Sequence, residues 1–327
     1  MTADTIGPAG PARITARAGQ RGALADKAFH GLTLVFAVLV LLVLCGVIAA
    51  LIHGSLPALR TFGFDFLALQ TWNPVTEQFG ALAPIYGTLV TSAIAMLIGI
   101  PVAFGVALFI TELCPAWLKR PLGTMIELLA AIPSIIYGIW GLFVLAPFLQ
   151  SYVQPALINT LGNIPGIGIL FAGPPLGIGV LTAGFILSVM VLPFIASVMR
   201  DVFETVPPVL KESAYALGST TAEVVWQVVL PYTRIGVVGG ILLGLGRALG
   251  ETMAVTFVIG NAHRIYPSLL QPGTTISAAL ANEFTEAVGD LYLSSLIALG
   301  LILFVITFFV LAAAKLLLMR LERQAGR

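Results

Sequence analysis

A charged pair, Arg247 and Glu251, lies inside a long apolar stretch and is the feature most able to do chemistry. The stretch covers residues 235–260, enough for one helical crossing of a bilayer. At about 1.5 Å per residue, Arg247 would lie roughly 18 Å from its start, near the middle of the hydrocarbon layer. A charge at that depth is costly unless it faces protein or water. The pair therefore predicts a functional site within a membrane.

Arginine suits one class of ligand at such a site. Its planar guanidinium stays charged at any working pH and matches the oxygens of an oxyanion with two parallel hydrogen bonds. Glu251, one helical turn from Arg247, would hold the cation while no anion is present, so that no unpaired charge is buried. Two interpretations stay open: the pair contacts a passing anion, or it is a structural ion pair that orders the helix.

Three glycines on the same predicted helix share a face with the charged pair. Gly236, Gly240 and Gly244 recur every four residues, and Arg247 and Glu251 extend that stripe. Glycines at this spacing let a second helix approach closely. We therefore expect this face to pack against a helix or to line a cavity.

Composition places the whole chain in a membrane. Of its 327 residues 58% are hydrophobic and 9% are charged, with a mean hydropathy of +1.03. Soluble domains carry about 25% charged residues. The net charge of +1 provides no basic surface for nucleic acid. Cys45, Cys114 and the three histidines have neither a disulfide framework nor metal-ligand spacing, so we expect no metal site.

The predicted fold is all-α, a polytopic membrane protein with six transmembrane helices. A polar segment, residues 1–28, is predicted to be a disordered tail, and residues 29–327 to form the transmembrane domain. Lys and Arg gather in the tail, in the second and fourth connections and at the C-terminus, which places both termini in the cytoplasm. The predicted spans cover residues 32–52, 85–110, 124–149, 176–199, 235–260 and 291–319.

The longest cytoplasmic connection, residues 201–233, is predicted to form two short amphipathic helices. The first would follow Pro207 and close at Gly218, a residue typical of helix C-termini. Thr220 and Glu223 have the spacing of a capping box and would open the second helix. Pro231 would end it, because proline lacks an amide proton.

For the other acidic residues and the prolines within spans, structural roles are expected. Glu127 lies near the start of the third span, where Thr124 and Glu127 have capping-box spacing, so we favour a capping role over a functional one. Glu112 and Asp201 are placed at membrane edges and expected to be solvated. Pro133 and Pro193 are expected to kink their helices or to free backbone carbonyls.

The segment ESAYALGSTTAEVVWQVVLP resembles the cytoplasmic EAA loop of ATP-binding-cassette importer permeases. In that family the loop docks in a cleft of the ATPase subunit and transmits its closure. Ser213 and Val228 are mild departures from the family pattern, and the alternative is a helix pair lying on lipid headgroups. The residues at matching positions are Glu212, Ala214, Gly218, Val228, Leu230 and Pro231.

A narrower resemblance extends from about residue 30 to the C-terminus. The stretches GLGRALGETMAVTFVIGN, ELLAAIPSIIYGIWG and WNPVTEQFGALAPIYGTLVTS are similar to permease subunits of the high-affinity bacterial phosphate uptake system. The resemblance implies the type I ABC importer (MetI-like) fold and the inner membrane. It also implies three partners: a second phosphate permease subunit, an ATPase dimer and an extracytoplasmic phosphate-binding protein. The glycine stripe is a candidate contact for the second permease subunit.

The chain contains no phosphate-binding loop and no catalytic constellation, which predicts a transport subunit that is not itself an enzyme. ATP and Mg²⁺ would be bound by the partner ATPase, and this chain would hold no cofactor. The related permeases of sulfate, molybdate or phosphonate remain the main alternative. An ATP-independent secondary transporter or channel, with Arg247 and Glu251 as ion-coupling groups, is the alternative from another class.

Overall fold

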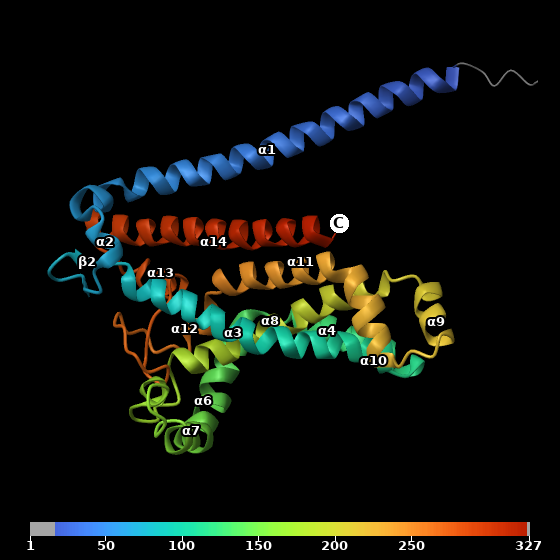
Figure 1. Cartoon of the computed structure of the whole chain (residues 1–327). Coiled ribbons are helices and arrows are strands. Elements are labelled where there is room, and N and C mark those ends of the chain that lie inside the picture. Colours follow the sequence, from blue (N-terminus) through green and yellow to red (C-terminus); the bar gives the residue numbers. More distant parts are fainter. Residues whose placement is uncertain (1–16, 326–327) are drawn as a thin grey trace, which may run out of the picture. The chain divides into compact units, whose positions relative to one another are not determined.

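Long apolar runs form helices through most of the chain, because a helix satisfies its own backbone hydrogen bonds where water is absent. The computed structural model describes residues 17–325 (Figure 1). Within them, six helical stretches are long and apolar enough to cross a membrane. These candidate spans are Ala25–Phe62, Leu82–Leu113, Ser134–Thr160, Val180–Glu204, Thr221–Leu249 and Asp290–Arg320.

Several spans are assembled from shorter elements. An antiparallel pair, β1 (Trp72–Asn73) with β2 (Gln78–Phe79), is the only sheet in the described chain. The described chain also contains four π-helical turns and one 3₁₀ turn, Gly168–Phe171. The α-helices are α1 (Arg17–Phe62), α2 (Asp65–Ala68), α3 (Leu82–Leu108), α4 (Ala116–Ala131), α5 (Ser134–Trp140), α6 (Ala146–Phe148), α7 (Gln154–Thr160), α8 (Val180–Glu204), α9 (Pro208–Ala216), α10 (Thr221–Val224), α11 (Leu230–Leu249), α12 (Met253–Thr256), α13 (Ile276–Glu283) and α14 (Asp290–Ala325).

The chain divides into two units, Met1–Ala50 and Leu51–Arg327. The described part of the first unit is the N-terminal part of α1. The second unit contains the end of α1 and all later elements. A disordered tail was predicted for residues 1–28. Of these, residues 1–16 lie outside the described residues. Residues 17–28 differ from that prediction, since they begin α1.

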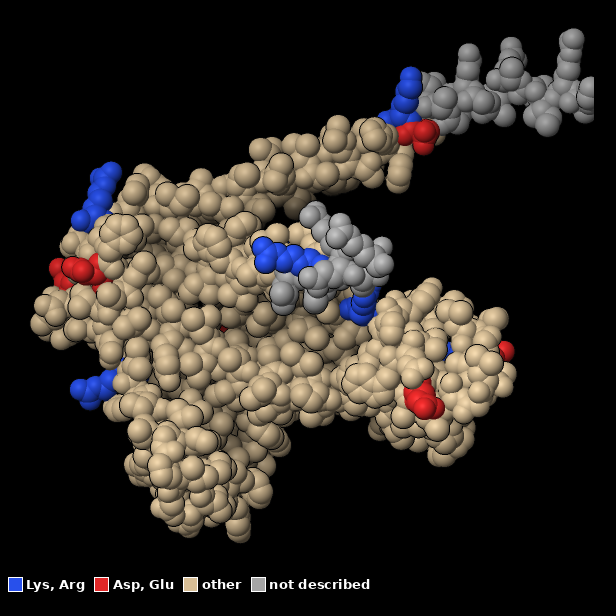
Figure 2. Space-filling model, in the orientation of Figure 1, with Lys and Arg blue, Asp and Glu red and all other residues tan. Residues whose placement is uncertain are grey.

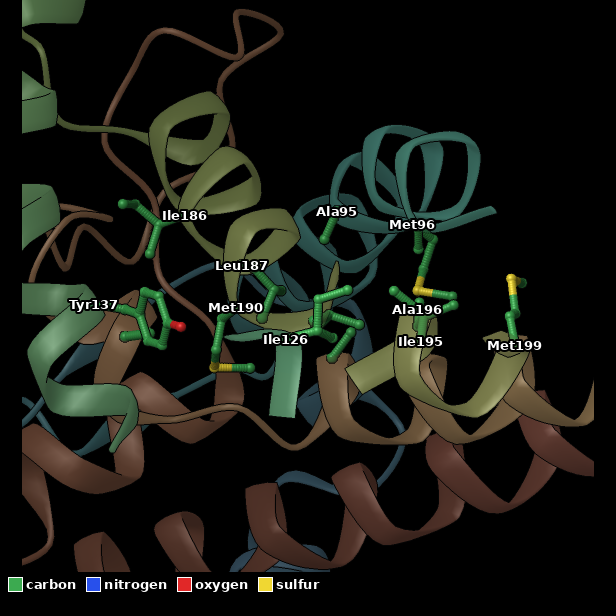
Figure 3. Close-up of a cluster of buried hydrophobic side chains, with 14 of the residues drawn as sticks. Ala95, Met96, Ile126, Tyr137, Ile186, Leu187, Met190, Ile195, Ala196 and Met199 are labelled. Atoms are coloured by element: carbon green, nitrogen blue, oxygen red, sulfur yellow. The ribbon is translucent and has the colours of Figure 1, made fainter. Parts of the chain in front are cut away.

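The core of the second unit is built around α8. This helix packs along α3 more extensively than any other two elements pack together, and it also contacts α4 and α11. Figure 3 shows side chains from α3, α4, α5 and α8 meeting in this core. The labelled residues include Ala95, Ile126, Tyr137, Leu187 and Met190. Charged residues are few on the face shown in Figure 2, and they gather toward the ends of the helices.

Proline spacing explains the π-helical turns. The four turns in the described chain are Phe109–Leu113, Gly141–Leu145, Leu149–Val153 and Val225–Val229. Each ends two residues before a proline. Proline lacks an amide proton and its ring crowds the carbonyl of the preceding turn, and a widened turn relieves this clash. The helix continues through three of these prolines, but after Phe109–Leu113 it ends, because Cys114 is extended.

Two predicted spans differ from the observed helices. The third was placed over residues 124–149, but the chain breaks at Ile132, whose backbone is extended, and Pro133 precedes a new helix. The residue before a proline is pushed away from helical geometry, which accounts for the break. The fifth was placed over residues 235–260, but α11 ends at Leu249. Pro193, by contrast, stays inside α8 and is buried.

Candidate translocation and coupling site

Arg247 and Glu251 lie on either side of a helix end. Arg247 is in the last turn of α11, where a cation interacts favourably with the helix dipole. Gly250 ends the helix, and Glu251 follows in irregular backbone. The expectation that both residues share one helix face is therefore wrong, because the helix does not continue through Gly250.

The two side chains have different partners. The Glu251 carboxylate accepts a hydrogen bond from the backbone amide of Ala254 at 3.2 Å, which helps to cap the short helix α12. The guanidinium carbon of Arg247 lies 5.8 Å from the ring centroid of Phe194 on α8. None of the ion pairs among the described residues joins Arg247 to Glu251. Glu251 therefore does not neutralise the charge of Arg247. The Arg247 side chain is exposed in this single chain.

The glycine stripe packs against a helix of the same chain. A methyl group added at Gly244 would lie 2.5 Å from the Ile195 side chain, and one at Gly240 would lie 3.1 Å from Val198. Gly236 faces Val202 in the same way. All three contacts are with α8, so this face is already covered. The expectation that the stripe contacts a second permease subunit is corrected accordingly.

The connection between α8 and α11 has the turn geometry that the sequence predicts. Gly218 has a φ of +89°, a conformation that favours glycine, just beyond α9. The Thr220 side chain accepts a hydrogen bond from the Glu223 amide, and the Glu223 carboxylate accepts one from the Thr220 amide. The capping box is therefore confirmed. We refer to residues 208–223, α9 with this turn, as the elbow.

Pro231 does not end the second helix, contrary to the sequence-based expectation. The π-helical turn before it keeps the backbone helical, and one helix runs from Thr221 to Leu249. Over its 29 residues this helix is about 43 Å long. Leu230 and Pro231 thus lie within it, and Arg247 lies near its far end. The last residues of the elbow, from Thr221 on, and Arg247 therefore belong to one continuous helix.

Most of the elbow's side chains are exposed. No residue of α9 is buried, and Leu217 is 89% exposed. Glu212 and Gly218 are exposed, whereas Ala214 is half-buried and packs against the core. Apolar side chains on an exposed turn are typical of a surface that contacts another protein.

Glu112 and Glu127 have roles that the sequence analysis missed. The Glu112 side chain is 6% exposed and its Oε1 lies 2.6 Å from the Lys211 Nζ of α9, so the expectation of a solvated carboxylate is wrong. Thr124 and Glu127 lie in the middle of α4, where no helix begins, so the capping prediction is wrong as well. Glu127 instead pairs with Arg200 of α8 at 2.8 Å, and Asp201 pairs with the same guanidinium.

A second polar cluster, which we call the outer cluster, consists of Trp72, His263, Glu283 and Tyr292. The Trp72 indole and the Tyr292 hydroxyl donate hydrogen bonds to the Glu283 carboxylate at 2.6 and 2.7 Å. Nε2 of His263 lies 2.6 Å from the same carboxylate, and its ring stacks on Trp72. Burial alone would raise the pKa of Glu283, but these hydrogen bonds outweigh it and hold that pKa below its usual value. No local sequence pattern joins these residues, which come from separate segments.

Comparison with solved structures identifies the fold as that of ABC transporter permeases. A chain of a bacterial alginate ABC transporter, crystallised with an alginate pentasaccharide-bound periplasmic protein, is 19% identical and has a TM-score of 0.61. The alignment covers 92% of this chain and 97% of that one. A chain of the inward-facing MetNI methionine ABC transporter is 17% identical with a TM-score of 0.55, and covers 79% of this chain.

Residues 99–323 match the family described as the binding-protein-dependent transport system inner membrane component. The chain belongs to this family, and it is a multi-pass membrane protein and a transport subunit. The phosphate transport system permease protein PstC of Mesorhizobium japonicum is 66% identical over 94% of both chains. The protein of the same name from Pasteurella multocida is 58% identical over 91% of this chain and 93% of that one. A probable PstC of Methanocaldococcus jannaschii is 39% identical over 83% of this chain.

Proposed function

We propose that this chain is the permease subunit of an ATP-driven importer of inorganic phosphate and forms half of the translocation pathway across the bacterial inner membrane. The observation that carries this proposal is the similarity to relatives named phosphate transport system permease, which are up to 66% identical along nearly their whole length. The coupling elbow and the membrane arginine supply the chemistry that such a role requires.

Arg247 is the proposed contact for phosphate. It lies where α11 stops and irregular backbone begins, and helix breaks within a membrane are tolerated where they line a cavity or a protein interior. Among the described residues no carboxylate forms an ion pair with its guanidinium, which presents paired donors that match phosphate oxygens. Glu251 contributes by ordering the backbone after the break, through its hydrogen bond to the Ala254 amide.

The elbow is the proposed contact for the ATPase. Its exposed apolar side chains, including Leu217 and Val209, would be buried in a cleft of that subunit. Mg²⁺-ATP would be bound there and not by this chain. Closure of the ATPase dimer would push the elbow, and the helix from Thr221 to Leu249 would carry the displacement to Arg247.

The side of the membrane on which each end of the helices lies determines which partner would contact it. We place both termini and the elbow in the cytoplasm, on the side where Lys and Arg gather. The outer cluster then faces the extracytoplasmic space, where a phosphate-binding protein would dock. A second, related permease chain would complete the pathway over the exposed face of Arg247.

Transport would proceed by alternating access. ATP binding would close the ATPase dimer and open the pathway outward, where the binding protein releases phosphate. Hydrolysis would then return the pathway to its inward-facing state. Because phosphate carries its own charge, a transient contact with Arg247 lowers the cost of crossing the apolar layer.

Uptake of labelled phosphate by cells with and without this gene tests the substrate. We expect loss of high-affinity uptake without the gene, and no competition from excess sulfate or molybdate in cells that carry it. Competition by sulfate or molybdate as strong as that by unlabelled phosphate would identify another oxyanion as the substrate.

A further inference from the structure

Helix α9 is held weakly to the rest of the chain. None of its residues is buried, and its principal neighbours are α10 and the π-helical turn Val225–Val229. At one end it leads into Gly218, a residue with open space around it and a positive φ. At the other end it begins after Pro207. A segment attached in this way would rotate about its ends unless a further contact fixed it.

One ion pair supplies that contact. Nζ of Lys211, on α9, lies 2.6 Å from Oε1 of Glu112, 99 residues earlier in the chain. The two side chains are 19% and 6% exposed. Removing one member of a buried pair leaves an uncompensated charge, so each side chain depends on the other. The Arg200–Glu127 pair is less buried, because the Glu127 side chain is 57% exposed and water can solvate it.

Glu112 belongs to the end of a long, well-packed helix. It lies in the π-helical turn Phe109–Leu113 that continues α3, beside the buried residue Thr111. Nζ of Lys119, from α4, donates a hydrogen bond to the Thr111 carbonyl oxygen at 2.7 Å. Helix α3 in turn has the most extensive packing in the described chain, along α8. A displacement of Glu112 would therefore move α3 and α8 together.

We infer that Lys211 and Glu112 are positioning residues that transmit movement of α9 to α3. The inference rests on the proposed role of the elbow in contacting the ATPase. The ion pair would be a second route for movement of α9. The first route is the chain itself, which continues from α9 through α10 into α11. With both routes intact, α9 moves α3, α8 and α11 as one body. Without the ion pair, α9 moves α11 alone and energy from ATP is lost to rotation about the elbow.

The test is made on the complete complex of two permease chains, ATPase dimer and binding protein, reconstituted in lipid vesicles. Variants E112Q and K211M are compared with the charge swap E112K/K211E. We expect assembled single variants to import fewer phosphate ions per ATP hydrolysed, by about fivefold or more. The swap should restore most of that ratio. E127Q, which breaks the exposed pair nearby, is the matched control and should leave the ratio unchanged.

Single variants with an unaltered ratio of phosphate to ATP would overturn the inference. So would a charge swap as defective as the single variants. If E112Q does not assemble, E112D decides: it keeps the charge and shortens the link by one methylene, and an unchanged ratio would again overturn the inference. Phosphate uptake by the unaltered complex tests the proposed function separately, since only comparison among variants tests the ion pair.

Discussion

At the scale of single residues, the position of Arg247 defines the candidate pathway. It lies in the last turn of α11, and a charge within a bilayer is costly unless it faces protein or water. Its guanidinium lies over the ring of Phe194, an interaction weaker than a carboxylate pair. A guanidinium held in this way remains available to an anion that passes it.

Replacing Arg247 separates charge from geometry. We expect R247Q to lower ATP-driven phosphate uptake by at least about tenfold while the complex still assembles, because a neutral amide cannot stabilise the anion. R247K, the matched control, keeps the charge but loses the planar fork and should give an intermediate rate. Measured uptake by R247Q equal to that of the unaltered complex would show that Arg247 is structural.

Glu251 should behave differently from Arg247, since the two are not paired in this structure. E251A removes the acceptor for the Ala254 amide and should loosen the backbone after α11. We expect lower thermal stability by about 1 kcal/mol and a partial loss of uptake. E251Q retains an acceptor oxygen and should restore most of the stability. Equal losses in R247Q and E251Q would instead indicate a functional pair.

At the scale of helices, the packing of α11 on α8 depends on glycines. Ile195 is fully buried, so it has little room to move away from a methyl group added at Gly244. We expect G244A to destabilise the protein by about 1–3 kcal/mol through overpacking. G239A is the control, because nothing lies within 4 Å of the added methyl group. Thermal unfolding in detergent measures both, and equal stability of the two variants would contradict the observed packing.

Sequence patterns predicted these elements where the cause was local. The apolar runs predicted the number of spans, and the spacing of Thr220 and Glu223 predicted the start of the helix after the elbow. The prediction that Pro231 ends the helix was wrong, because a π-helical turn before the proline keeps the backbone helical. The pairing of Glu112 with Lys211 was hidden for another reason: these residues are 99 positions apart, and only the fold brings them together.

At the scale of the whole molecule, the outer cluster ties together segments that are distant in sequence. Trp72, His263, Glu283 and Tyr292 come from β1, a loop, α13 and α14. Three of these side chains contact the carboxylate of the fourth, Glu283, so the cluster joins these four segments of the second unit. At the other ends, ion pairs from Glu112 and Glu127 join α3 to α9 and α4 to α8.

The outer cluster predicts how stability depends on pH. The pKa of Glu283 in the folded protein lies below its ordinary value of 4.5, because hydrogen bonds to the ionised carboxylate outweigh burial. The cluster therefore contributes fully above that value and loses its contribution as the pH falls through the folded pKa. We expect E283Q to lower stability by about 1–3 kcal/mol at neutral pH, with the difference from the unaltered protein shrinking under acid conditions.

Thermal unfolding of both proteins from neutral pH down to about pH 3 measures this dependence. E286Q is the control, because Glu286 is exposed and its side chain makes no hydrogen bond among the described residues. A difference between E283Q and the unaltered protein that stayed constant down to the lowest pH would contradict the assigned role of the carboxylate.

The central claim is that this chain passes phosphate only when its elbow is moved by a separate ATPase. The most direct measurement is accumulation of labelled phosphate in lipid vesicles that contain either the complete complex or this chain without the ATPase. We expect labelled phosphate to accumulate against a gradient only with the complete complex and ATP. Accumulation driven by this chain without the ATPase would contradict it.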